Sequence, residues 1–559
     1  MKKIKWLGIF VLGLLVVLWG GSVVAKISTK IPSETNSFVD DYYIEETNQN
    51  EPFFDVVLPE IKRNIKENNK HSINPYFNKL PKANNPENFQ GLGSTSYANI
   101  NGKTVTAEAF YRVKGDSLDD PNVGQGLLIY QCIQYKMAHP DADVEIAFTT
   151  YRASATASVC VLPQSKYYGY MRSLFGANYD EHGFVRISYM LAEAARMGID
   201  VTIVTQYPSY AVKQYNAETG KTEKRKAMKF ETYFEKALKT DCYKKYASGK
   251  KVSDFMNFVN VDWTVGDQGS NMQHVKACAV SHYRDTDGKD HKWGTFFTTS
   301  NLDDNKYNGE NGNGKSQSGV IISNHEQVFR VTKNYIKLMS KYGDKEGLQE
   351  LRKLVSDRNA EQTALIKAGK ESSIPKSEQI IYLGTSKDPV FRVYFTPINS
   401  NIDGWDVENN PICEHVDKLA KSNDYVEFAW NEAFIEKNYM VETIGEILNN
   451  KYCEYPNHKN KISTHVSEVD LTPIANLAKG SEIGFRNLND SADQHAKDFL
   501  MSYEHLGERH DVSILTSCNY VMVAFHYRTN SIVVIDETAK TGGDFYEIMA
   551  SKFAPGMVK

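Results

Sequence analysis

Hydrophobic and polar positions follow two different periods along residues 105–559. Short apolar or alternating runs, typical of strands, precede longer stretches in which apolar residues recur every three or four positions, as in helices. Residues 187–197, for example, form a helical pattern that ends at Gly198, and 201–204 form an apolar run typical of a buried parallel strand. This alternation predicts an α/β layered fold with a largely parallel or mixed sheet.

The same order of predicted elements occurs twice along the chain. Four pairs of segments, first half before second, predict strands: 109–113 and 391–395, 143–148 and 424–429, 294–297 and 512–515, and 319–322 and 531–535. Three further pairs predict helices: 126–137 and 413–419, 187–197 and 439–448, and 326–339 and 544–553. We therefore predict two similar α/β/α layered halves with mixed sheets.

The repeat also sets the predicted domain boundaries. We place the two halves at 91–341 and 379–559, and we interpret 342–378 as a connector because it holds a charged helical pattern followed by Ser372-Ser-Ile-Pro375. Residues 31–90 are rich in Asn, Glu, Lys and Pro, and the prolines would interrupt helices and strands repeatedly. This stretch is therefore predicted to be a spacer.

The N-terminal residues 1–30 suggest how the chain is targeted. Lys2, Lys3 and Lys5 precede an uncharged stretch at 6–25, about the length that spans a bilayer as a helix. This pattern predicts either a signal-anchor or a signal peptide cleaved after Ala25. The expected location is the cell membrane, single-pass with an extracytoplasmic catalytic part, or the exterior if the segment is removed.

Composition excludes several classes of protein. The net charge of −4 excludes a globally basic nucleic-acid binder, and the hydrophobic content of 41% allows a large core. Seven cysteines in 559 residues are too few for a disulfide-built scaffold, and none of them form a C-x-x-C pair, so neither a thioredoxin-type site nor a zinc ribbon is indicated. Cys278 and Cys518 either pair with each other or remain buried thiols.

One chemical motif recurs at matching places in both halves. Gln273-His274-Val275-Lys276 is matched by Gln494-His495-Ala496-Lys497, and Thr298-Thr299-Ser300-Asn301 is matched by Thr516-Ser517-Cys518-Asn519. Each tetrapeptide ends a predicted strand, and another predicted strand follows it. A single His-x-Lys would arise by chance, but two copies in the same structural context indicate a functional pair.

These motifs resemble those of the phospholipase D superfamily. That family carries two His-x-Lys-x4-Asp motifs, each followed by a Gly-Ser-x-Asn-like tetrapeptide, and the resemblance covers roughly residues 105–559. The chain departs from the pattern where Ser281 and Ser502 replace the motif Asp, and where Thr298 and Thr516 replace Gly. The spacers after the two motifs are also longer and are expected to form hairpins. The departures place the chain in a divergent branch.

The resemblance implies a pseudo-two-fold site between the halves and a role for each motif residue. His274 is expected to be the nucleophile and His495 the general acid and base, although the reverse assignment is open. The side chains expected to hold the phosphate oxygens are those of Lys276, Lys497, Asn301 and Asn519. Thr299 and Ser517 are expected to bind phosphate or position a histidine, and Glu326 and Glu537 to orient the histidine rings.

The implied activity is hydrolysis of a phosphodiester through a phosphohistidine intermediate, with no metal or other cofactor. The substrate is either a phospholipid or a nucleic acid, the membrane is expected to be contacted through the N-terminal segment, and the oligomeric state is open. Two alternatives remain. One is a phosphatidyltransferase like the cardiolipin synthases, which usually have two N-terminal spans and an intact motif Asp. The other is a non-catalytic phosphate-binding pseudoenzyme.

Overall fold

The computed structural model describes residues 92–553 with internal gaps. The gaps are 113–120, 154–157, 161–183, 208–211, 217–220, 226–229, 264–270, 286, 303–316, 345, 399–409, 423–425, 433–460, 467–482, 486–494 and 520–521. The N-terminal segment (1–30), the spacer (31–90) and the predicted helix at 439–448 lie outside the described residues.

Eight strands form the first sheet, in the order β1-β2-β12-β11-β10-β3-β6-β9. Their bounds are β1 Gly93–Ile100, β2 Lys103–Arg112, β3 Glu145–Arg152, β6 Asp200–Tyr207, β9 Met256–Asn260, β10 Ala277–Arg284, β11 Asp290–Thr298 and β12 Gln317–Ser323. β3, β6 and β9 pair in parallel, and the remaining neighbours pair antiparallel. The sheet is therefore mixed.

Seven strands form the second sheet, in the order β13-β19-β18-β17-β14-β15-β16. Their bounds are β13 Phe391–Phe395, β14 Glu427–Glu432, β15 Lys461–Val466, β16 Ile483–Phe485, β17 Asp498–His505, β18 Glu508–Thr516 and β19 Ser531–Thr538. Read from β2, the first sheet has the same strand order and the same sequence of antiparallel and parallel pairs. The predicted duplication is thus visible strand by strand, and the predicted α/β fold with mixed sheets is confirmed.

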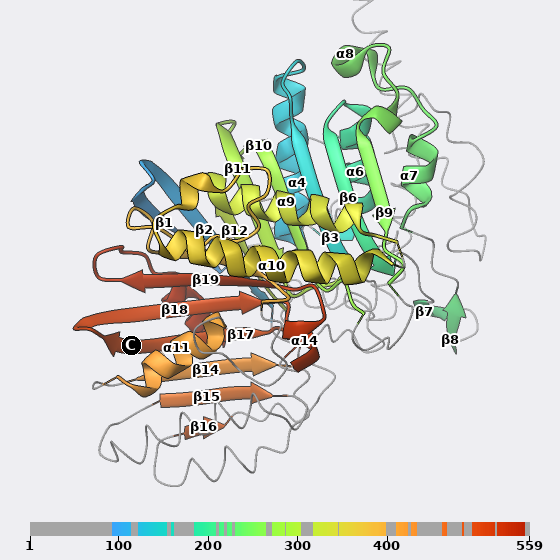
Figure 1. Ribbon diagram of the computed structural model, residues 1–559. Helices are drawn as coiled ribbons and strands as arrows, with labels where there is room; N and C mark the ends of the chain where they lie inside the picture. Colours follow the sequence, from blue (N-terminus) through green and yellow to red (C-terminus); the bar gives the residue numbers. More distant parts are fainter. Residues whose placement is uncertain are drawn as a thin grey trace, which may run out of the picture.

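Helices cover both sheets and occupy the space between them (Figure 1). α4 (Pro121–Ala138) and α6 (Ile187–Arg196) contact each other and pack on one face of the first sheet, whereas α9 (Glu326–Lys341) packs on the other. α11 (Pro411–Ala420) packs on β17 in the second sheet. The remaining elements are α14 Met522–His526, the connector helix α10 Gly347–Lys367, the short helices α7 Thr232–Ala237 and α8 Lys244–Ala247, the 3-10 turns Val252–Asp254 and Glu371–Ser373, and the strand pairs β4 Ser158–Cys160 with β5 Phe184–Arg186 and β7 Val212–Asn216 with β8 Lys221–Arg225.

The closing helix of each half also contacts the other half. α9 reaches β13 of the second sheet, and α15 (Phe545–Phe553) packs on β1 and β2 of the first sheet as well as on β18. Each half therefore relies on the other to bury the apolar face of its last helix.

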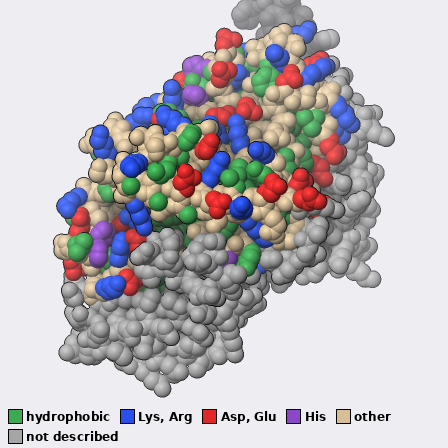
Figure 2. Space-filling model, viewed as in Figure 1, with side chains coloured by type: hydrophobic (Ala, Val, Ile, Leu, Met, Phe, Trp, Pro, Cys, Tyr) green, Lys and Arg blue, Asp and Glu red, His purple; other side chains and the backbone are tan. Residues whose placement is uncertain are grey.

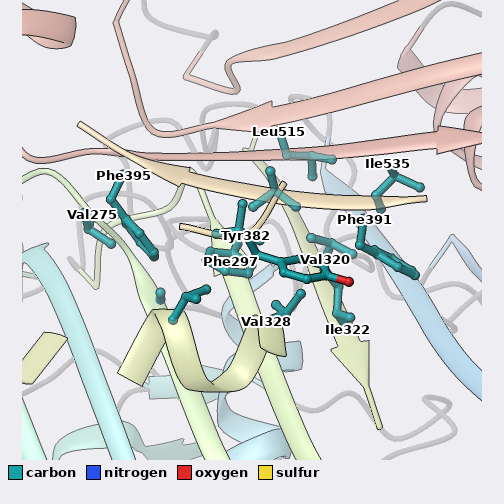
Figure 3. Close-up of a cluster of buried hydrophobic side chains, with 14 of the residues drawn as sticks. Val275, Phe297, Val320, Ile322, Val328, Tyr382, Phe391, Phe395, Leu515 and Ile535 are labelled. Carbon is teal, nitrogen blue, oxygen red and sulfur yellow. The ribbon is translucent and has the colours of Figure 1, made fainter. Parts of the chain in front are cut away.

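A single apolar cluster joins the two sheets (Figure 3). Side chains from the first half, such as Val320 and Phe297, point toward side chains from the second, such as Leu515 and Phe391. All four are buried, and burial of this kind contributes about 1.5–3 kcal/mol for each large aliphatic or aromatic side chain. The halves are thus held together by a shared core, and the motif residues lie at its edge because Val275 and Ala496 belong to the same cluster.

Charged side chains of both signs alternate over the face formed by α9 and α10 (Figure 2). Arg330 pairs with Glu326 at 3.0 Å, and Lys333 pairs with Glu145 at 2.8 Å. Partly exposed pairs of this kind contribute at most about 1 kcal/mol each to stability. Positive and negative side chains on this face therefore pair with each other locally, in keeping with the small net charge of the chain.

The expected membrane location is not supported. Among the residues that the structure describes, no helix combines the length and the apolar character needed to cross a membrane. This finding contradicts the expected single-pass localisation, and residues 6–25, on which the expectation rested, are outside the described part of the chain.

Candidate active site

Each His-x-Lys motif lies directly before the first strand of a hairpin, and each Thr-[Thr/Ser]-x-Asn segment starts at the end of the second strand. In the β10–β11 hairpin the Thr298 N–H donates to the Lys276 carbonyl at 3.1 Å, and in the β17–β18 hairpin the Thr516 N–H donates to the Lys497 carbonyl at 3.1 Å. The same bond in both hairpins brings the two parts of each motif side by side. The predicted hairpin spacers are confirmed, with Gly288 (φ 79°) and Gly507 (φ 79°) at their turns.

The first motif also pairs with the segment that precedes β19 in the second half. The His274 N–H donates to the Thr529 carbonyl at 2.8 Å, and the Thr529 N–H donates to the Met272 carbonyl at 3.0 Å. These two bonds form a short parallel bridge across the junction of the halves. The main chain of His274 is therefore held by the backbone of the second half, in addition to the contacts of its ring.

The two histidine rings are oriented by oxygen atoms from the opposite halves. His274 Nδ1 lies 2.6 Å from the Ser517 carbonyl and 3.0 Å from Asn530 Oδ1. His495 Nδ1 lies 2.9 Å from Gln317 Oε1. Each half thus supplies the group that positions the histidine of the other half, and the two motifs form one interlocked site.

Thr299 and Ser517 support these orienting groups. Thr299 Oγ1 donates to Gln317 Oε1 at 3.0 Å, and Ser517 Oγ donates to Asn530 Oδ1 at 3.4 Å. Of the two roles considered for these hydroxyls, positioning a histidine is the one that their contacts favour. The chain Thr299–Gln317–His495 has its counterpart in Ser517–Asn530–His274.

The contacts of His274 determine where its proton lies. A backbone carbonyl can only accept, so Nδ1 carries the hydrogen that is donated to Ser517, and Nε2 keeps its lone pair. Burial lowers the pKa of His274 well below 6.5, and the charges of Lys276, Lys497 and Arg528 lower it further. The ring is consequently neutral at pH 7, which is the form that a nucleophile requires.

Both motif lysines are fully buried and bound to the backbone of their own histidine. Lys276 Nζ donates to the His274 carbonyl at 2.9 Å, and Lys497 Nζ donates to the His495 carbonyl at 2.7 Å. Because ammonium groups in a water-poor site act more strongly on nearby charge than they do in water, two lysines here favour an anionic ligand.

The motif asparagines complete each half-site. Asn301 is held near the start of α4, since Asn122 Nδ2 donates to its carbonyl at 3.4 Å and to Ser300 Oγ at 2.9 Å. The Oδ1 atoms of Asn301 and Asn519 are buried and have no hydrogen-bond partner among the described residues. A buried amide with an unsatisfied oxygen indicates a place where a water molecule or a ligand binds.

A second layer of contacts holds the loop that carries His274. Arg352 of the connector helix donates to the Tyr527 carbonyl at 2.7 Å and to Asn271 Oδ1 at 2.9 Å. Gln206 Nε2 donates to the Asn271 carbonyl at 2.7 Å, and the Gln273 N–H donates to Gln206 Oε1 at 2.8 Å. The connector thus ties together the segments on both sides of the junction.

Sequence reasoning missed four residues of this site. Gln317 and Asn530 orient the histidines, Arg528 acts on the charge state of His274, and Tyr151 meets the His274 ring edge to face at 5.2 Å. The signal that could have found two of them is positional. Gln317 begins β12 and Asn530 immediately precedes β19, so they stand at equivalent places in the two halves.

The structure does not place Glu326 and Glu537 at the histidines, so the orienting role expected of them is wrong. Glu326 pairs with Arg330 and Lys376. Glu537 accepts hydrogen bonds from the Tyr97 hydroxyl and from the first N–H groups of α15. Glu326 begins α9, beyond the end of β12, and Glu537 lies near the end of β19, whereas Gln317 and Asn530 stand at the starts of these strands. A strand of seven residues spans about 23 Å, so both glutamates are separated from the histidines by about the length of a strand.

Five of the cysteines are buried free thiols in the described part of the chain. Cys278 and Cys518 are buried free thiols, so of the two alternatives for this pair the disulfide is not observed. In the described part of the chain, no group of three His, Cys, Asp or Glu side chains is arranged to hold a metal ion.

Comparison with known proteins yields only distant structural likenesses. No family model matches the chain, and no curated protein matches it. Polyphosphate kinase from Porphyromonas gingivalis shares 11% identity over 78% of this chain at a TM-score of 0.35, and this chain covers only about half of that protein (48%). Phosphatidylserine synthase from Haemophilus influenzae Rd KW20 shares 9% identity over 79% of this chain and 84% of its own, at a TM-score of 0.37.

A third likeness is to a mutant of yeast tyrosyl-DNA phosphodiesterase, with 10% identity over 62% of this chain and 79% of that protein at a TM-score of 0.28. All three proteins belong to the phospholipase D superfamily, which the motifs resemble. Scores this low carry no argument about fold or function, so the functional conclusion depends on the site itself.

Proposed function

We propose that this chain is a phospholipase D-type phosphodiesterase that acts through a phosphohistidine intermediate. The observation that carries the proposal is the reciprocal orientation of the two histidines. His274 Nδ1 donates to oxygens of the second half, and His495 Nδ1 contacts Gln317 of the first half. In both rings Nδ1 is the nitrogen that the opposite half orients, so Nε2 is the nitrogen assigned to chemistry in a two-step displacement at phosphorus.

In the first step, His274 Nε2 attacks the phosphorus atom. The N–P bond forms as the bond from phosphorus to the leaving oxygen breaks, and His495 Nε2 gives its proton to that oxygen. In the second step, His495 takes a proton from water, the water oxygen attacks phosphorus, and the N–P bond breaks. The neutral His274 is restored, and the products are an alcohol and a phosphomonoester.

The charge that develops on the non-bridging oxygens is held by side chains from both halves. Lys276 and Lys497 supply ammonium groups, and Asn301 and Asn519 supply amide N–H donors. Both lysines are fully buried, which supports a role in binding an anionic ligand. Such preorganised donors typically contribute about 10²–10³-fold each to the rate.

The test is a panel of phosphodiesters given to the purified chain. Bis(p-nitrophenyl) phosphate probes the chemistry without a macromolecule, a phosphatidyl lipid in detergent micelles probes one substrate class, and a single-stranded oligonucleotide probes the other. Rapid quenching followed by peptide mass spectrometry at alkaline pH locates the phosphoryl group. The expected result is hydrolysis with phosphate on His274.

Three results would change the conclusion. If no substrate is turned over, or if turnover is the same in His274→Ala and His495→Ala as in the wild type, the chain is not an enzyme of this class. Phosphate on His495 would reverse the assignment of roles. Transfer of the phosphatidyl group to an added alcohol, without hydrolysis, would identify a transferase.

A further inference from the structure

The two half-sites differ at the residue that directly follows the motif lysine. Ala277 begins β10 after Lys276, whereas Asp498 begins β17 after Lys497. Both positions are fully buried. The second half therefore carries an ionisable group, next to its lysine and away from solvent, that the first half lacks.

Asp498 lies against the first half with only part of its carboxyl group satisfied. Ser318 Oγ of β12 donates to Asp498 Oδ1 at 2.6 Å, while Oδ2 is buried without a hydrogen-bond partner among the described residues. Its partners in register are Asn431 of β14 and Leu515 of β18, neither of which titrates. In the described part of the chain, Lys497 is the one charged group that acts on its pKa.

This environment makes the charge of Asp498 variable near neutral pH. Burial raises the pKa of Asp498 to about 7, and the Ser318 hydroxyl and Lys497 partly oppose that rise. The carboxyl group is consequently uncharged in mildly acidic solution and becomes negative as the pH passes through neutrality.

Two routes connect Asp498 to His495. Lys497 adjoins it in the chain and binds the His495 carbonyl at 2.7 Å. Ser318 binds it and also donates its N–H to Thr299 Oγ1 at 2.9 Å; Thr299 in turn holds Gln317, the residue that orients His495. Ala277 offers the first half no such connection.

We propose that Asp498 is a positioning residue that sets the positive charge of the second half-site, so that His495 rather than His274 is the proton-carrying histidine. This inference rests on the proposed function and deepens it. When Asp498 is ionised it offsets Lys497, and an imidazolium at His495 becomes less costly. When it is protonated, its negative charge is lost, the site becomes more positive by one charge, and anions bind more tightly. His274, which lies under the influence of three cations, stays neutral in both states.

The experiment measures the affinity of inorganic sulfate for the full chain by calorimetry between pH 5 and 9, because sulfate keeps its charge over that range. The wild type is expected to lose affinity as the pH rises through about 7. Asp498→Asn is expected to lack that step and to bind about tenfold more tightly than the wild type at pH 8, the equivalent of one pKa unit of interaction. Glu537→Gln, which removes a buried carboxyl group far from the histidines, is expected to keep the step.

Two further variants separate Asp498 from the histidine itself. His495→Gln should retain the step, because the titrating group is the carboxyl group. Ser318→Ala removes the hydroxyl that opposes the rise in the pKa of Asp498, so its step should move to higher pH. Loss of the carboxylic-acid C=O infrared band as the pH rises through 7 provides a direct readout, and Asp498→Asn should remove its share of that band.

The inference fails if Asp498→Asn keeps the wild-type pH dependence, if the step disappears in His495→Gln, or if Ser318→Ala leaves the midpoint unchanged. None of these measurements needs turnover. A chain that shows the step but cleaves no phosphodiester would overturn the proposed function alone, whereas a chain that cleaves phosphodiesters without the step would overturn the inference alone.

Discussion

The two half-sites have the same residues at their centres and different surroundings. Each has a histidine, a buried lysine and an asparagine, but the His274 ring is held by a backbone carbonyl and Asn530, whereas the His495 ring contacts Gln317. Asp498 adjoins the second lysine, where the first half has alanine. A duplicated fold can therefore supply two similar groups and still assign them different work, because the packing around each group sets its charge.

The comparison also shows that neither half is complete alone. The first half orients the histidine of the second, the second half orients that of the first, and α9 and α15 both contact the opposite sheet. Variants at matched positions should consequently produce effects that cross from one half to the other.

The largest expected effect comes from the histidines themselves. His274→Ala and His495→Ala should each lower kcat by about 10³-fold or more with substrates that have alkoxide leaving groups. With p-nitrophenolate, a leaving group that needs no proton, His495→Ala should slow the first step much less than His274→Ala does, whereas hydrolysis of the intermediate should still be slow because His495 is its base. The rapid release of p-nitrophenolate in the first turnover measures that step separately, and equal losses of its rate in the two variants would mean that the two roles are not divided in this way.

The lysines should show the next largest effect. Lys276→Met and Lys497→Met should each reduce kcat/KM by about 10²–10³-fold, because each removes charge stabilisation from the phosphate oxygens. Both lysines lower the pKa of His274, so Lys497→Met, made in the other half, should raise that pKa. NMR titration of the His274 ring measures it, and an unchanged His274 pKa in Lys497→Met would contradict the shared electrostatics.

The orienting residues should have smaller effects that cross between the halves. Asn530→Ala and Gln317→Ala should each lower kcat by about 10–100-fold, the scale expected when a reacting group is displaced by about 1 Å. Asn530→Ala should slow formation of the phosphohistidine, and Gln317→Ala should slow proton transfer to the leaving oxygen. Asn530→Asp keeps an acceptor for His274 Nδ1 and is the matched control. Pre-steady-state kinetics resolve the two steps, and slowing of the same step in both variants would argue against crossed orientation.

Glu537 should affect stability rather than catalysis. Burial raises its pKa to about 7 in the folded chain, above the ordinary value of 4.5. Because the folded state holds this proton more tightly than the unfolded state, its contribution to stability is complete below about pH 4.5 and is lost as the pH rises through 7. Asp498 acts with the same sign over a similar range.

Glu537→Gln should therefore flatten the decline in the free energy of unfolding between pH 5 and 8. At pH 5 it should cost about 1–3 kcal/mol, because the new amide would face the Tyr546 N–H donor. Urea unfolding at several pH values measures both effects, with Asp498→Asn as the companion variant. If neither variant changes the slope of the free energy of unfolding against pH, other titrating groups cause that slope.

Glu326 should have the smallest effect. Glu326 forms ion pairs with Arg330 and Lys376, and its side chain is partly exposed. Glu326→Gln should therefore change the free energy of unfolding by less than about 1 kcal/mol and kcat by less than about twofold. Thermal unfolding and steady-state assays check this, and a large loss of kcat would return Glu326 to the site.

Much of the fold followed from local pattern. Every described strand of the predicted pairs is present, and α9 begins at its predicted start, residue 326. These predictions succeeded because strand and helix periods are set by which face of an element is buried, and that is written in neighbouring residues. The six motif residues could be predicted for a related reason, since each motif stands at a fixed place beside a strand end.

The residues that sequence reasoning missed are those whose partners are far away along the chain. Gln317 meets His495 across 178 positions, and Asn530 meets His274 across 256. Glu326 and Glu537 were expected to orient the histidine rings because they follow the strands after the motifs, but Glu326 begins α9 and Glu537 lies near the end of β19, away from the site. The local sequence pattern does not show which end of a strand lies near the histidine of the other half.

The sequence by itself thus determined the elements and their duplication, and it predicted which His, Lys and Asn side chains form the proposed site. The tertiary structure alone decided which oxygen orients each histidine, that Asp498 is enclosed between the halves, and that His274 is neutral. The physical reason is that periodicity records only burial within one element, whereas hydrogen bonding and the charge of a buried group depend on what the opposite half places against it.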